Sequence, residues 1–216
     1  MNYLFGSKAG PLPQTNWNGF FAGIVGGGAL ASVRGTGVDT FQPNGEIGNN
    51  GTSWSAGAQI GYNWMLGPRV VVGLEGDFSY FGIKNGSPNY FNSFNADLQI
   101  DTSWIATARG RLGYSTGPAL LYVTGGAAWV NVKETFSGPT AITTNKSTLD
   151  GWTAGGGIET TLGRSWSTKT EYLFVDVGNG TTVADGGFVI TADHKYHLFR
   201  SALVYRFSGG PISSPF

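Results

Sequence analysis

The sequence predicts an all-β fold class, an eight-stranded antiparallel transmembrane β-barrel with up-and-down topology. Three observations support this prediction: a strict two-residue periodicity with the charges on one face, a repeat of about 50 residues, and two groups of aromatic residues near the expected strand ends. The longest apolar run, residues 23–31, is too short for a membrane-spanning helix, which needs about 20 residues.

Composition narrows the classes of protein that remain. Charged residues make up 12% of the 216 residues, against about 25% in an average soluble domain. The formal net charge is zero, so nothing indicates a nucleic-acid partner. The absence of cysteine excludes a disulfide framework, a thiol nucleophile and a thiolate metal site. A soluble β-sandwich is compatible with these numbers, so the choice depends on the pattern along the chain.

The clearest strand is the segment at residues 104–114, WIATARGRLGY. Its even positions carry Trp104 and Tyr114 at the ends and small or aliphatic residues between them, whereas its odd positions include Arg109 and Arg111. Successive side chains of a strand point to opposite faces, so one face is apolar and the other bears two guanidinium groups. About ten residues of tilted strand cross a bilayer, so the pattern predicts a lipid-facing wall around a polar interior.

A repeat organises the other strands. Trp54, Trp104 and Trp152 lie about 50 residues apart, and each opens an alternating segment that leads through a tight turn into a second one. We expect the short turns at residues 66–69, 115–118 and 162–165, and long polar loops at residues 35–52, 84–99, 136–147 and 178–192. The strands are then expected at residues 17–33, 53–65, 70–83, 100–115, 119–135, 149–163, 165–177 and 193–207.

Aromatic residues favour the barrel over the sandwich. All seven tryptophans lie near expected strand ends, as in the aromatic girdles at the two membrane interfaces. The girdle expected at the short-turn end contains Trp17, Trp64, Trp166, Tyr114, Tyr205 and Phe207, and the other contains Trp54, Trp104, Trp129 and Trp152. A sandwich would bury some of these tryptophans in mid-strand.

The side chains on the other face of each strand are expected to point into the lumen. Its charged residues are Glu75, Asp77, Arg109, Arg111, Glu159, Lys169, Glu171, Arg200 and Arg206. Buried charges must be paired, and five cations with four anions permit a paired network. The first strand contains so much glycine that its facing is ambiguous.

The sequence gives little support for a metal, catalytic or phosphate-binding site. His194 and His197 point to opposite faces of a strand, so we expect rim residues rather than a metal site. No His-x-Ser pair is present, and the glycine runs at residues 125–126 and 155–157 lie inside strands, which argues against phosphate loops. We therefore expect no enzyme activity, no cofactor and no metal.

Both ends of the expected barrel resemble a known family. The segment WNGFFAG at residues 17–23 resembles the opening W-x-G-F-Y-x-G of small outer-membrane proteins of alphaproteobacteria, the porin-family or OmpA-like eight-stranded barrels. Residues 204–207, VYRF, resemble their closing strand, whose final aromatic residue is read by the barrel-assembly machinery. The chain departs from the family in continuing to Phe216, with Pro211 and Pro215 in this tail.

The resemblance implies a location and partners. We expect the bacterial outer membrane, with the signal peptide already removed because residues 1–7 lack its basic and apolar regions. The expected organisation is an N-terminal periplasmic linker at residues 1–16, a barrel at 17–207 and a C-terminal periplasmic tail at 208–216. Outer-membrane lipid, lipopolysaccharide and the barrel-assembly machinery are the expected partners, with other envelope proteins or a second copy as further options.

The expected function is structural. An eight-stranded barrel is just wide enough for side chains to fill, so a lumen occupied by charged residues should not conduct freely. This predicts a surface-exposed barrel whose loops contribute to envelope integrity or contact proteins and lipopolysaccharide. A narrow or gated solute pore is the alternative, and a lipid-modifying enzyme with a site at the outer rim is the third.

Overall fold

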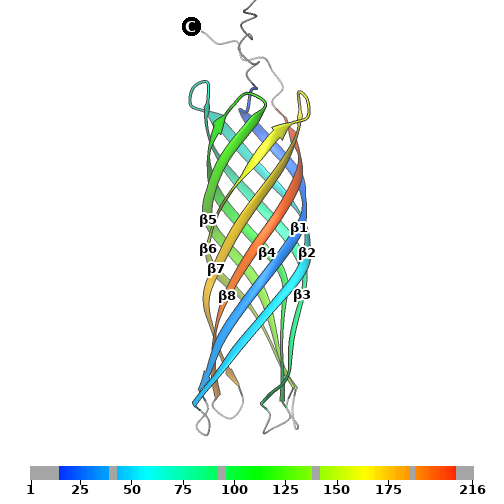
Figure 1. The fold of residues 1–216 in the computed structure, drawn as a ribbon, viewed down its shortest axis with the longest axis vertical. Coiled ribbons are helices and arrows are strands. Elements are labelled where there is room, and N and C mark those ends of the chain that lie inside the picture. Colours follow the sequence, from blue (N-terminus) through cyan, green and yellow to red (C-terminus); the bar gives the residue numbers. More distant parts are fainter. Residues whose placement is uncertain (1–14, 39–42, 92–95, 138–141, 185–187, 208–216) are drawn as a thin grey trace, which may run out of the picture.

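The computed structural model describes residues 15–38, 43–91, 96–137, 142–184 and 188–207. These residues form one closed barrel in which each strand pairs antiparallel with the next and β8 pairs with β1 (Figure 1). The strands are β1 (Gly19–Val38), β2 (Pro43–Met65), β3 (Val70–Phe91), β4 (Ala96–Ser115), β5 (Ala119–Ser137), β6 (Ile142–Thr161), β7 (Trp166–Ala184) and β8 (Phe188–Arg206). The predicted eight-stranded up-and-down barrel is confirmed. Within the described ranges, no helix is long and apolar enough to cross a membrane.

Side chains alternate between the lumen and the outer wall as the two-residue period predicts. On β4, Thr107, Arg109 and Arg111 are buried inside the barrel, whereas Ala108 and Leu112 are exposed on its outside. The structure also resolves the ambiguous first strand. Its odd positions, such as Phe21 and Val25, face inward, and its even positions, such as Phe20 and Ile24, face outward.

Three short connections join the strands at the end where β1 begins. They lie between Met65 and Val70, between Ser115 and Ala119, and between Thr161 and Trp166, where the turns were predicted. Gly67 and Gly117 adopt φ angles of 101° and 103° in the first two turns. Glycine suits these positions because other residues rarely adopt positive φ.

The strands are longer than expected, and the prediction of long polar loops is wrong. β1 continues to Val38 and β2 begins at Pro43, so most of the loop expected at residues 35–52 is strand, and the other three hairpins extend likewise. The prediction relied on alternation between apolar and polar residues. Residues 142–151 of β6, for example, are mainly polar on both parities and show no such alternation, although their main chain remains paired with β5.

At their far ends the strands separate into two four-stranded sheets. β2 and β3 pair only as far as Ser55↔Phe81, and β6 and β7 only as far as Trp152↔Asp176. The other six pairings continue along the extensions, as far as Val38↔Val189 between β1 and β8. The extensions therefore form one sheet of β7-β8-β1-β2 and another of β3-β4-β5-β6, visible as two groups at the lower end of Figure 1.

Inward-facing glycines make room for the charged residues of the lumen. Five charged residues each lie directly across from a glycine on the next strand: Gly61↔Glu75, Gly73↔Arg111, Gly126↔Arg109, Gly157↔Glu171 and Gly27↔Arg200. A Cβ atom at any of these glycines would overlap atoms of a neighbouring strand. Large charged side chains thus alternate with glycines, which have no side chain, and together they fill a narrow barrel.

Candidate functional site

The candidate site is the packed lumen, and Arg109 lies at its centre. The Arg109 guanidinium contacts Glu75, lies 2.8 Å from an Asp77 carboxylate oxygen, and lies 3.4 Å from a Glu171 oxygen. Its Nε donates to the Thr107 hydroxyl at 2.9 Å. These residues come from β3, β4 and β7, so the contacts cross the barrel.

Two further cations extend this network. Arg200 lies 2.6 Å from Asp77 and 2.5 Å from Glu171, which joins β8 to β3 and β7. Lys169 Nζ lies 2.7 Å from Glu75 and 3.5 Å from Glu171. All of these side chains are at most 2% exposed, so each charge depends on its ion-pair partners rather than on water.

The fourth cation joins the network on the side of the short turns. Arg111 lies 2.9 Å from Glu159, and the Ser167 hydroxyl donates to the same carboxylate at 2.6 Å. The Arg111 guanidinium also lies 4.4 Å from the centre of the Tyr122 ring, while the Tyr122 hydroxyl donates to Glu171 at 2.9 Å. Through these contacts the structure brings together eight of the nine predicted charged residues, with four positive and four negative charges.

Arg206 is the exception, and its predicted place among the carboxylates is wrong. No described carboxylate lies within the 4.0 Å of an ion pair with it; its guanidinium instead donates to the main-chain oxygens of Asn16, Gly163 and Arg164 at 3.3–3.4 Å. The reason is its position at the end of β8, next to the short turns and away from the centre of the charged network.

Trp17 also departs from the prediction, because it faces the lumen rather than lipid. Its side chain is fully buried, and its indole N–H donates to the Ser115 hydroxyl at 3.0 Å. The Arg206 guanidinium lies 4.7 Å from the centre of the indole ring. Trp17 lies two residues before β1 and shares the inward, odd parity of Phe21 and Val25, which the glycines of this strand conceal in the sequence. The indole fills the mouth of the barrel at the short-turn end.

An apolar layer fills the lumen on the other side of the charged network. Inward-facing Phe81, Ile105, Val130, Leu173 and Leu198 are at most 2% exposed and pack together. The expectation of a polar interior therefore does not hold for this part of the barrel, which packs like an ordinary protein core. Apolar residues on both parities, as in the run LFV at residues 173–175, were the signal that could have revealed it.

The other predicted girdle residues lie on the outer wall. Trp54, Trp64, Trp129, Trp152, Trp166, Tyr114, Tyr205 and Phe207 are exposed, and half-buried Trp104 stacks on Phe78 with ring centres 5.5 Å apart. Near the short turns, Trp166 contacts Tyr205 edge-on at 5.0 Å between ring centres. The outward side chains between the two groups are mainly small or aliphatic.

The two histidines lie on opposite faces of β8. His194 is fully buried, facing inward at the level where β7 separates from β6. His197 faces outward, with its Nδ1 2.7 Å from the Tyr172 hydroxyl. Within the described residues, no group of three or more His, Cys, Asp and Glu side chains is placed to hold a metal ion.

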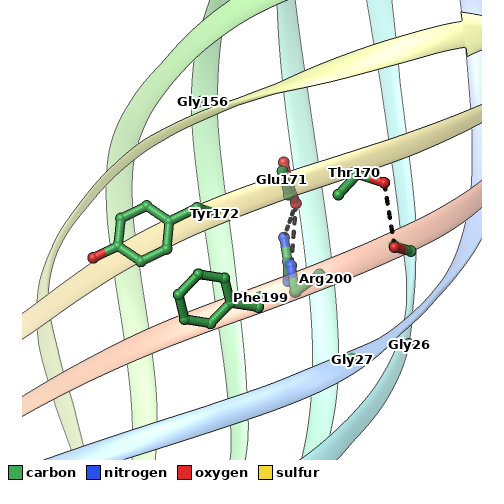
Figure 2. Close-up of a pocket in the computed structure, with 9 residues that line it drawn as sticks. Gly26, Gly27, Gly156, Thr170, Glu171, Tyr172, Phe199 and Arg200 are labelled. Carbon is green, nitrogen blue, oxygen red and sulfur yellow. Dashed lines mark hydrogen bonds and ion pairs between the residues drawn. The ribbon is translucent and has the colours of Figure 1, made fainter.

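A shallow depression of about 280 Å³ lies on the outer wall where β6, β7, β8 and β1 are side by side (Figure 2). Gly26 and Gly156 line it, Tyr172 and Phe199 stand at its border, and the Thr170 hydroxyl lies 3.3 Å from that of Ser201. It opens on the outward face of the barrel, whereas the neighbouring Glu171–Arg200 ion pair belongs to the lumen.

Comparison with known proteins identifies the family. The sequence matches the outer membrane protein beta-barrel domain over residues 4–207. The chain belongs to this family. It is 30% identical to the 31 kDa outer-membrane immunogenic protein of Brucella melitensis over 209 residues, which covers 92% of this chain and 87% of that protein. It is 29% identical to the 22 kDa outer membrane protein of Rhizobium leguminosarum over 177 residues, 81% of this chain and 71% of that protein.

Solved structures agree with this outer-membrane barrel in fold. The outer membrane protein OprG of Pseudomonas aeruginosa superposes with a TM-score of 0.53 at 12% identity, over 90% of this chain and 99% of OprG. The outer membrane protease OmpT of Escherichia coli gives a TM-score of 0.52 at 11% identity, over 88% and 97%. The protein is therefore an outer-membrane barrel. Barrels of this kind place their short turns on the periplasmic side and their longer hairpins outside the cell.

Proposed function

We propose that this outer-membrane barrel is a closed anchor that holds two β-sheets above the cell surface, where they contact other envelope components. The observation that carries the proposal is the filling of the lumen at three successive levels. Trp17 fills the periplasmic mouth, the eight-charge network fills the middle, and the apolar layer around Ile105 and Leu173 fills the outer part.

Each level opposes permeation for a different physical reason. The indole of Trp17 is a steric obstacle held by a hydrogen bond to Ser115. An ion that entered the middle would have to separate pairs such as Arg200–Asp77, which are buried and contact each other at 2.6 Å. The aliphatic side chains of the apolar layer, such as Ile105, Val130 and Leu173, cannot replace the hydration shell of a solute.

We do not propose an enzyme. A catalytic site at the outer rim would need a histidine that substrate can reach beside a nucleophile. His194 is enclosed in the lumen, and His197 contacts Tyr172 on the outer wall. The relatives are named as outer-membrane immunogenic proteins, which agrees with exposure at the surface rather than with an activity.

The alternative of a narrow pore has one observation in its favour. The buried side chains of Ser55, Gln59 and Asn63 follow the inner face of β2, and each has a polar atom without a hydrogen-bond partner in the protein. Such atoms usually bind internal water, so we expect a short row of enclosed water molecules there. Trp17 at one end and the apolar layer at the other keep this row from becoming a channel.

Electrical recording in planar bilayers tests the closed anchor. The wild-type protein should insert, as judged by heat-dependent migration of the same preparation on a denaturing gel, and should show no steady conductance. A large ohmic conductance that increases stepwise with each insertion would overturn the proposal and favour the pore. A barrel known to conduct, inserted under the same conditions, serves as the control.

A further inference from the structure

Outside the membrane, β6 has one side with which no strand of the described residues pairs. β6 leaves β7 at Trp152↔Asp176 but remains paired with β5 as far as Ser137↔Ile142. Residues 142–151 therefore form an edge strand. Edge strands present a row of unpaired main-chain N–H and C=O groups, which is a template for another strand.

The hydrogen-bond register shows which residues present these groups. Thr161 N donates to the Pro118 carbonyl at 2.9 Å, so odd-numbered residues of β6 direct their main-chain groups to β5. Consistently, the Ser147 carbonyl accepts from the Asn131 side chain of β5 at 3.4 Å. The even-numbered residues direct N–H and C=O to the free side; they are Ile142, Thr144, Lys146, Thr148 and Asp150, all with exposed side chains.

Each of the three other edges of the two sheets carries a proline or a register shift. The edge of β2 begins with Pro43, and that of β3 contains Pro88 and two register shifts. The edge of β7 has a register shift between Asp176 and Asn179, with Gly178 at a φ of 67°. Prolines and bulges are the usual means by which proteins protect sheet edges.

The edge of β6 lacks these protections. Its register with β5 is uninterrupted from Ala119↔Thr160 to Ser137↔Ile142, and residues 142–151 contain no proline. The stretch ITTNKSTLDG is rich in threonine, which suits strands, and carries only Lys146 and Asp150 as charges. Of the described edges of the two sheets, it combines a regular register with a threonine-rich stretch, whereas the β2 edge at residues 45–54 is regular but carries three glycines and a proline at its tip.

We propose that residues 142–151 of β6 bind an extended segment of a partner polypeptide, which adds to the sheet as a further strand. β6 and β7 cease to pair after Trp152↔Asp176, so the free edge at residues 142–151 is ten residues long, the length of a single extended segment. A second copy of the barrel would have to bring a whole four-stranded sheet into the same space. The main chain supplies the binding groups, and the alternating exposed side chains of Thr144, Lys146 and Thr148 supply selectivity for a polar segment.

This inference rests on the proposed role at the surface but not on the closed lumen, so the two can fail separately. Conductance tests the lumen, whereas peptide binding tests the edge. The probe is a set of ten-residue peptides selected from a random phage-displayed library on wild-type protein in lipid nanodiscs. Affinity is measured by titration, and main-chain contacts are measured by protection of amide hydrogens from exchange.

The decisive variant is Thr148→Pro, because proline removes the N–H on the free side and leaves the pairing with β5 in place. We expect it to weaken peptide binding about tenfold or more, since it removes a main-chain hydrogen bond and adds a ring at the edge. Thr148→Val keeps the N–H and is the matched control, expected to bind within about twofold of wild type. Lys146→Pro repeats the test if Thr148→Pro loses heat-dependent gel migration.

In the wild type, bound peptide should slow amide exchange at Thr144, Lys146 and Thr148. The proposal is wrong if no peptide is selected, if Thr148→Pro and Lys146→Pro bind as well as Thr148→Val, or if protection falls on another edge. It is also wrong if sedimentation shows a dimer that Thr148→Pro dissociates, because the occupant of the edge would then be a second copy.

Discussion

Replacing Arg109 with alanine tests whether the charged network carries the stability of the barrel. Arg109 contacts Glu75, Asp77 and Glu171, and its removal changes the net charge of the eight-residue network from zero to −1. Removing one member of a buried ion-pair cluster costs about 3–5 kcal/mol, because the remaining charge loses its partner away from water. We expect Arg109→Ala to lower the free energy of unfolding by this amount.

The measurement is urea unfolding in lipid vesicles, followed by tryptophan fluorescence. Arg109→Met keeps much of the side-chain volume and separates loss of charge from the cavity. Combining it with Asp77→Asn restores a neutral network, so the double variant should be destabilised by less than the sum of the two single variants. The expected coupling is about 0.5–3 kcal/mol. A loss below about 1 kcal/mol for Arg109→Ala would refute this reasoning, since a well-hydrated lumen would then be screening the charges.

Three further substitutions test other parts of the barrel by the same unfolding assay. Ala108→Arg places a charge toward lipid and should cost about 2–4 kcal/mol, whereas Ala108→Leu should be close to neutral; equal effects would contradict the outward facing of Ala108. Gly126→Ala should cost about 1–3 kcal/mol because its Cβ would overlap the main chain of Ala108 and Arg109, while outward-facing Gly125→Ala, with its nearest neighbour at 3.4 Å, should cost little. Trp17→Ala should cost about 3–5 kcal/mol for a buried indole, and a value near zero would mean that the indole does not fill the periplasmic mouth.

The barrel and the facing of its charged strands could be predicted because membrane-spanning strands alternate strictly. Arg109 and Arg111 occupy one parity of a strand whose other parity is apolar, and only a closed wall satisfies both faces. Alternation gives no information about segments that do not cross the membrane. The strand extensions show no such alternation, as the stretch ITTNKSTLDG of β6 illustrates, and the glycines of β1 conceal the inward parity that Trp17 shares with it.

The partners within the lumen could be predicted as a set but not as pairs. Alternation places Asp77 and Arg200 inside, yet they are separated by 123 residues, and only closure of the barrel brings them within 2.6 Å. The inward glycines were visible as an abundance of glycine. Their individual positions opposite charged residues, such as Gly126 opposite Arg109, depend on the register between strands, which sequence periodicity does not specify.

The contribution of β8 to the charged network has a consequence for assembly. Arg200 is the only cation that β8 supplies to the eight-charge network, and without it four carboxylates would face three cations. A sheet of seven strands would therefore enclose an excess negative charge as well as two unpaired edges. Insertion of the last strand removes both penalties in one step, so sealing of the wall and neutralisation of the interior should occur together during biogenesis.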